Sequence, residues 1–182
     1  MNIGFLAIAW ALTLTTATLL TTIGPLSAVQ IGASDSLASF TVGIFLIGAA
    51  LSSVPSGILF RRFGRFIGFT VGCTCQLVGS ILGFLSLYNN DLTTLFFGCF
   101  ILGLGQGLGQ FYRFSAIELS PPELKSRAVT YVLSGGIIAA FLGPTAATYS
   151  AKILSTEYQG SFLAITLVIV LISSILKTSM YQ

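Results

Sequence analysis

The stretch Gly57-Ile-Leu-Phe-Arg-Arg-Phe-Gly-Arg-Phe66 places three arginines between two long apolar runs. Inserting Lys or Arg at the centre of a bilayer costs about 3 kcal/mol per residue, so this cluster predicts a loop between two membrane-spanning helices. Because basic residues gather in cytoplasmic loops, the turn is expected on the cytoplasmic side. The stretch therefore predicts both a membrane helix bundle and its orientation.

The composition of the whole chain agrees with a membrane protein. Of 182 residues, 54% are hydrophobic and 7% are charged, whereas soluble domains carry about 25% charged residues. This predicts a multi-pass integral membrane protein, in the bacterial inner membrane or another cell membrane, with the lipid bilayer as its surroundings. The net charge of +3 is confined to predicted loops, so it reports topology and gives no argument for a nucleic-acid partner.

Spanning helices account for most of the chain. Crossing the hydrocarbon core takes about 20 largely apolar residues, and six segments meet this requirement. We expect them to form a single six-helix transmembrane domain over residues 1–182. The predicted spans are 3–23, 40–60, 66–87, 92–111, 128–149 and 160–176.

The basic residues predict that both termini lie inside. An even number of spans brings the two ends of the chain to one side, and placing the arginine turn there leaves only Lys152 on the other side. The positive-inside rule thus favours an N-in, C-in orientation. In the longest inner connection, Ser120 can cap a short surface helix that opens with Pro121.

The residue types present disfavour an enzyme. The chain has no histidine, which removes the commonest general base and metal ligand. Cys73, Cys75 and Cys99 fall in apolar segments without neighbouring acidic ligands, so they are expected to be small core residues rather than a disulfide or metal site. We expect no catalytic residue, no metal and no cofactor.

The arginine turn also carries a family pattern. Four of its residues match the form G-x-x-x-D-R-x-G-R-R/K found between helices 2 and 3 of the major facilitator superfamily, while Arg61 replaces the acidic residue and Phe66 the final basic one. The chain thus resembles the amino-terminal half of such a transporter, in the bacterial efflux-like branch. The resemblance implies an inner gate loop, and a loop that serves topology alone is the alternative. The gate residues would be Gly57, Arg61, Arg62, Gly64 and Arg65.

The fourth predicted span contains Gly103-Leu-Gly-Gln-Gly-Leu-Gly109. This is similar to the family's helix 4 pattern R-x-x-Q-G-x-G, although Gly103 replaces an arginine that the family links to proton coupling. Gln106, Gln110 and Arg113 recur at i, i+4 and i+7 and form one polar stripe on a helix. Buried amides in a bilayer usually face a cavity, so Gln106 and Gln110 are predicted to line one. Hydrogen bonds that join helices are the alternative.

Two further helices carry candidate residues. Gly143 and Pro144 match the family's helix 5 pattern G-x-x-x-G-P-x-x-G-G in part, which implies a hinge or outer gate; a static kink is the alternative.

On the first span, threonines at i, i+3 and i+7 share a face. Because helices 1 and 4 of each half line the central cavity in the superfamily, the resemblance implies that they add to a substrate surface; otherwise their hydroxyls bond their own backbone. They are Thr15, Thr18 and Thr22.

The resemblance implies a half-size secondary transporter that moves a small organic solute by alternating access. Substrate sites in this fold lie between two six-helix halves, so we expect either a homodimer or a second transporter half, and the chain could equally be a fragment of a longer one. The competing hypothesis is a non-transporting membrane scaffold or accessory subunit of a larger membrane complex. Missing family charges at Arg61 and Gly103 favour that alternative.

Overall fold

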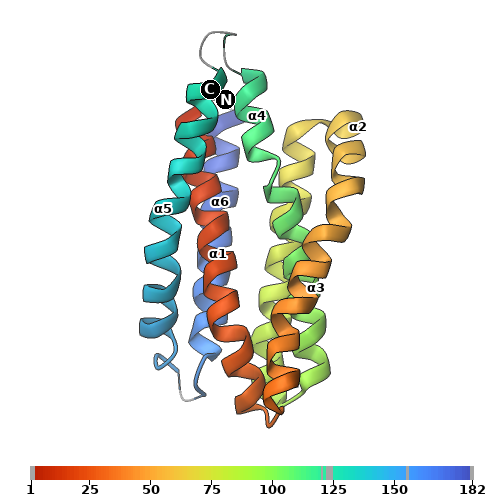
Figure 1. Cartoon of the computed structure of the whole chain (residues 1–182), viewed down its shortest axis with the longest axis vertical. Coiled ribbons are helices and arrows are strands. Elements are labelled where there is room, and N and C mark those ends of the chain that lie inside the picture. Colours follow the sequence, from red (N-terminus) through yellow and green to blue (C-terminus); the bar gives the residue numbers. More distant parts are fainter. Residues whose placement is uncertain (1–2, 120, 122–124, 155, 181–182) are drawn as a thin grey trace.

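The structure, a computed structural model, describes residues 3–119, 121, 125–154 and 156–180. Its helices run side by side in an elongated bundle (Figure 1). The predicted all-α fold class is confirmed. Five of the described helices are long and apolar enough to cross a membrane. The helices are α1 (Ile3–Gln30), α2 (Asp35–Asn89), α3 (Leu92–Gly109), α4 (Tyr112–Leu119), α5 (Lys125–Ser150) and α6 (Gln159–Met180).

Helix α2 is two helical arms joined at a glycine. At about 1.5 Å per residue, its 55 residues would extend far beyond a hydrocarbon core of about 30 Å if they were straight. Gly64 instead has φ 82° and ψ 171°, a conformation that glycine adopts without steric cost. The chain reverses there, so that the first arm (35–63) and the second arm (65–89) lie beside each other (Figure 1).

Several helix ends differ from the predicted spans, and the ends of α1 and α3 are two of them. Helix α1 continues through Pro25 to Gln30, past the predicted end at residue 23, so polar residues near an end do not stop it. Helix α3 ends at Gly109, and α4 begins after a short turn. Alternate glycines weaken the helix before this turn. Ser120, the predicted cap of a surface helix, lies outside the described residues.

Glycines let α3 fit closely between the two arms of α2. A Cβ atom at Gly103 would overlap the backbone of Phe45 in the first arm. On the opposite side, a Cβ atom at Gly105 would lie 2.6 Å from the carbonyl oxygen of Gly72 in the second arm. Close backbone approach of this kind replaces the hydrophobic effect as the source of helix association in lipid. The three segments therefore pack as one unit.

Both termini lie at the same end of the bundle, together with α4 and the reversal in α2 (Figure 1). The arginines beside Gly64 and Lys177 near the end of α6 are therefore at this end. The connection that contains Lys152 follows α5 at the opposite end. Most of the basic residues named here thus gather at one end, which is the end that the positive-inside rule predicts to be cytoplasmic.

Candidate functional site

A buried pair of amides joins α3 to the second arm of α2. Gln76 Nε2 donates a hydrogen bond to Gln106 Oε1 at 3.3 Å, and both side chains are buried. In an apolar bundle each amide supplies the partner that the other needs. Gln106 therefore forms the interhelical bond that the sequence left as the alternative to cavity lining.

The space beside this amide pair is small. The cavity between Gln76, Thr13 and Tyr112 measures about 10 Å³, which is at the lower limit for one water molecule. An organic solute does not fit there. In this conformation the Gln76–Gln106 pair belongs to helix packing.

A second polar cluster lies where α1 meets the start of α4. The Arg113 guanidinium donates to Gln110 Oε1 at 2.6 Å, and its central carbon lies 5.2 Å from the centre of the Trp10 ring. This is cation–π distance. Gln110 and Arg113 thus lie in contact across the turn between α3 and α4, rather than along one helix with Gln106 as their spacing predicted, and the indole of Trp10 contacts Arg113.

Two donors in this cluster lack an acceptor. Trp10 Nε1 and Arg113 Nε are both buried, and neither has a hydrogen-bond partner among the described residues. Leaving such a group unpaired costs about 1–3 kcal/mol. In the described conformation both donor atoms are closed off from the surface, so a bound molecule could reach them only if the surrounding helices moved apart.

The threonines of α1 are not equally accessible. Thr15 is buried and donates to the Ala11 carbonyl oxygen at 2.9 Å, and Thr22, which is exposed, donates to Thr18 at 2.8 Å. Thr18 is half-buried and also reaches the carbonyl oxygen of Ala139 in α5, at 3.3 Å. The hydroxyls therefore bond the backbone, which is the alternative to a substrate surface, and Thr15 faces the core.

The predicted hinge lies on the α1–α5 contact. A Cβ atom at Gly143 would lie 2.7 Å from Cβ of Thr18, so this glycine lets the two helices approach. Pro144 is exposed, and α5 continues as helix through it to Ser150. The described conformation thus combines a close contact at Gly143 with a missing backbone donor in the next residue.

Most of the predicted gate residues surround one open hollow at the arginine-rich end. It measures about 600 Å³, and Phe60 and Phe111 form part of its wall as stacked rings 4.6 Å apart. Arg62 faces a neighbouring hollow beside Val54. The structure thus brings together Gly57, Arg61, Gly64 and Arg65.

Comparison with known proteins agrees with this arrangement of helices. The family model of the Major Facilitator Superfamily matches residues 5–178. The chain belongs to the Major Facilitator Superfamily. It is therefore a multi-pass integral membrane protein of a transporter family, and the family resemblance predicted from its motifs is confirmed.

Three relatives illustrate the match. Riboflavin transporter RfnT of Brucella anthropi is 26% identical over 164 residues, which cover 90% of this chain and 41% of the relative. The uncharacterized MFS-type transporters YdeG and YddS of Bacillus subtilis are 27% and 25% identical, over 68% of this chain and 29% and 28% of their own lengths. This MFS chain thus spans less than half the length of the curated relatives that it matches.

The sequence patterns do not predict two residues of the polar clusters in this MFS chain. Gln76 is a single amide in an apolar segment, and Trp10 is a single aromatic residue near the start of α1. Neither residue belongs to a stripe of polar residues on one helix, which is the pattern that predicts a buried polar face. Only the arrangement of neighbouring helices shows their partners.

Proposed function

We propose that this MFS chain is half of a secondary transporter and moves a small organic solute by alternating access. Solute sites of this fold lie near the bilayer midplane between two six-helix halves. The second half is a second copy of the chain or the remainder of a longer polypeptide. The 41% coverage of RfnT supports a need for a second half.

The proposed half is one six-span domain with both termini inside. Its spans are α1, the two arms of α2, α3 with the start of α4, α5 and α6. The grouping of arginines and Lys177 at one end supports this orientation. The charged end then faces the cytoplasm, and the connection with Lys152 faces the outside.

The observation that carries the proposal is the pair of unpartnered donors at Trp10 and Arg113. In our proposal the alternating-access movement uncovers these donors, which are closed off in the described conformation, and the solute then places a planar ring against Trp10 and an oxygen acceptor on Arg113, which Gln110 holds in position. Thr18 and Thr22 extend this surface along α1, while Gln106 supports it by holding α3 to α2. Riboflavin, named for the relative RfnT, is a planar ring system with carbonyl acceptors and is therefore the first solute to test.

Rocking of one half against the other requires gates at the two ends. We assign the inner gate to the arginine turn from Gly57 to Arg65, where open space adjoins the reversal at Gly64. The outer movement is assigned to Gly143 and Pro144. Gly143 makes a close contact with α1, and Pro144 has no backbone N–H to donate a helical hydrogen bond. Both assignments place the moving parts away from the glycine-packed contact of α2 and α3.

Uptake of radiolabelled riboflavin into proteoliposomes tests the proposal. We expect saturable uptake under a proton or sodium gradient, and at least a tenfold loss for Arg113→Gln, since the solute acceptor then loses its charged partner. Lys152→Gln, which removes a cation at the opposite end, is the matched control and should retain uptake. Equal uptake by the two variants would contradict the assigned site.

A further inference from the structure

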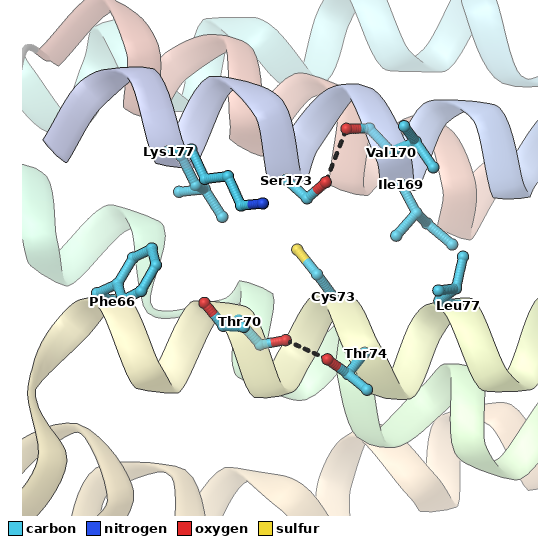
Figure 2. A pocket seen from close by; sticks show the side chains of 10 residues that line it. Phe66, Thr70, Cys73, Thr74, Leu77, Ile169, Val170, Ser173 and Lys177 are labelled. Atoms are coloured by element: carbon cyan, nitrogen blue, oxygen red, sulfur yellow. Dashed lines mark hydrogen bonds between the residues drawn. The ribbon is translucent and has the colours of Figure 1, made fainter. Parts of the chain in front are cut away.

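A groove separate from the proposed solute site runs between the second arm of α2 and α6. It measures about 210 Å³. Figure 2 shows Phe66, Thr70 and Cys73 on one side and Ser173 and Lys177 on the other. One end of it lies near the reversal in α2 and the end of α6, because Phe66 follows Gly64 by two residues and Lys177 is in the last turn of α6.

The groove adjoins a close contact of the same two helices. The hydroxyls of Ser80 and Thr166 lie 2.9 Å apart, and the ring of Phe162 packs directly against Gly83. From this contact toward the arginine-rich end, the helices present Cys73 and Ser173 to a gap that they leave unfilled. The groove is thus closed at its deep end by helix contact.

The lining changes in character along the groove. Its deep part is apolar and contains Leu77, Ile169 and Val170, of which Ile169 is buried. At the other end the Lys177 ammonium turns into the groove, opposite Phe66 and Thr70 (Figure 2). None of the residues that line it is acidic. A cation therefore marks one end and a hydrocarbon surface the other.

We propose that this groove binds an anionic phospholipid. The phosphate binds the Lys177 ammonium with help from the Thr70 hydroxyl, and one acyl chain lies along Cys73, Leu77 and Ile169. Basic pockets between helices on the cytoplasmic side attract anionic headgroups, and a membrane protein meets such lipids at high local concentration. The order from charge to hydrocarbon along the groove is the order within a phospholipid.

The size and the lining exclude two other occupants. Pockets for drug-sized solutes measure about 300–1,000 Å³, so 210 Å³ is small for a transported solute and adequate for part of one chain. Free phosphate would bind the ammonium but leave the apolar surface beside Ile169 and Val170 uncovered. The lipid is the occupant that uses both ends.

Native mass spectrometry of the chain released from nanodiscs of mixed phosphatidylglycerol and phosphatidylcholine tests the proposal. We expect phosphatidylglycerol to be retained preferentially. Lys177→Gln should lower the retained fraction about fivefold, the effect of one cation near a phosphate. Ser173→Phe should lower it as strongly by filling the gap while keeping the charge. Lys152→Gln, at the opposite end, is the control and should retain the lipid.

Three results would overturn the proposal. They are retention unchanged by both Lys177→Gln and Ser173→Phe, equal retention of the two lipids by the unsubstituted chain, and displacement of phosphatidylglycerol by inorganic phosphate alone. Far-ultraviolet circular dichroism of each variant establishes that the bundle is intact. Because the readout is lipid retention, loss of riboflavin uptake would not affect it, and the two proposals fail independently.

Discussion

The contact of α3 with the two arms of α2 differs from the contact of α1 with α4 and α5. The first is made by glycine and backbone, and its buried amides bond each other. The second contains half-buried threonine and arginine side chains and two donors without acceptors. The difference indicates a contact closed by backbone packing on one side of the bundle and, on the other, a contact that leaves two buried donors without acceptors.

The largest effect on stability is expected from adding a side chain to a glycine in the contact between α3 and α2. Gly105→Ala places a Cβ atom 2.5 Å from Cγ of Gln76, and overpacking of this kind costs about 1–3 kcal/mol. Gly57→Ala is the matched control because open space surrounds that position. In denaturing detergent, the free energy of unfolding should fall for Gly105→Ala and stay unchanged for Gly57→Ala. Equal stability of the two variants would mean that α3 can separate from α2 at little cost.

Breaking the hydrogen bond between Gln76 and Gln106 should have the next largest effect on the free energy of unfolding. Gln76→Leu or Gln106→Leu leaves the other amide buried without its partner, at a cost of about 1 kcal/mol for interhelical hydrogen bonds in membranes. The double variant should cost less than the sum of the two single ones. A double-mutant cycle of unfolding free energies measures this coupling, and strict additivity would show that the amides act separately.

On the α1–α5 side a smaller effect is expected. Thr18→Val removes the bond to the carbonyl oxygen of Ala139, worth about 0.6 kcal/mol in a bundle of this kind. Thr21→Val is the control, since that hydroxyl is exposed and bonds only within α1. The stability difference between the two variants isolates the contact between helices. No difference would indicate that α1 and α5 gain nothing from this bond.

The smallest effect on stability is expected at Asp91, the residue that caps the start of α3. Hydrogen bonds from the Thr94 hydroxyl and the Thr93 amide lower the pKa of Asp91, the N-cap of α3. A lowered folded-state pKa contributes stability above the ordinary carboxyl pKa of about 4, and this contribution is lost as the pH falls through the lowered value. The free energy of unfolding of the unsubstituted chain should therefore decline as the pH falls through this range. Asp91→Asn, which does not titrate, should show a flatter profile, and identical profiles would contradict the assigned cap.

Sequence patterns predicted the parts of the structure that depend on one helix at a time. Long apolar runs marked the helices, the arginine turn marked the reversal beside Gly64, and short patterns identified the family. Gln110 and Arg113 are in contact, but the turn between α3 and α4 and the bond from Gln76 to Gln106 mean that the predicted stripe does not run along one helix. These features follow from hydropathy and helical period, which are local properties.

The partners across helices could not be predicted in this way. Periodicity gives the face of a helix but not the register of its neighbour, so the bond from Gln76 to Gln106 and the position of Trp10 beside Arg113 stayed hidden. The length of α1 was missed for a related reason. Its last turns beyond residue 23 form despite polar residues and Pro25, because helix packing continues where hydropathy declines.

The central claim is that the unpartnered donors at Trp10 and Arg113 bind the transported solute. Trp10 is the only tryptophan in the chain, so its fluorescence reports directly on this site. Titration with riboflavin, corrected for absorption by the ligand, should give saturable quenching that Arg113→Gln weakens at least tenfold and Lys152→Gln leaves unchanged. Quenching that does not saturate, or that is the same in both variants, would contradict the claim.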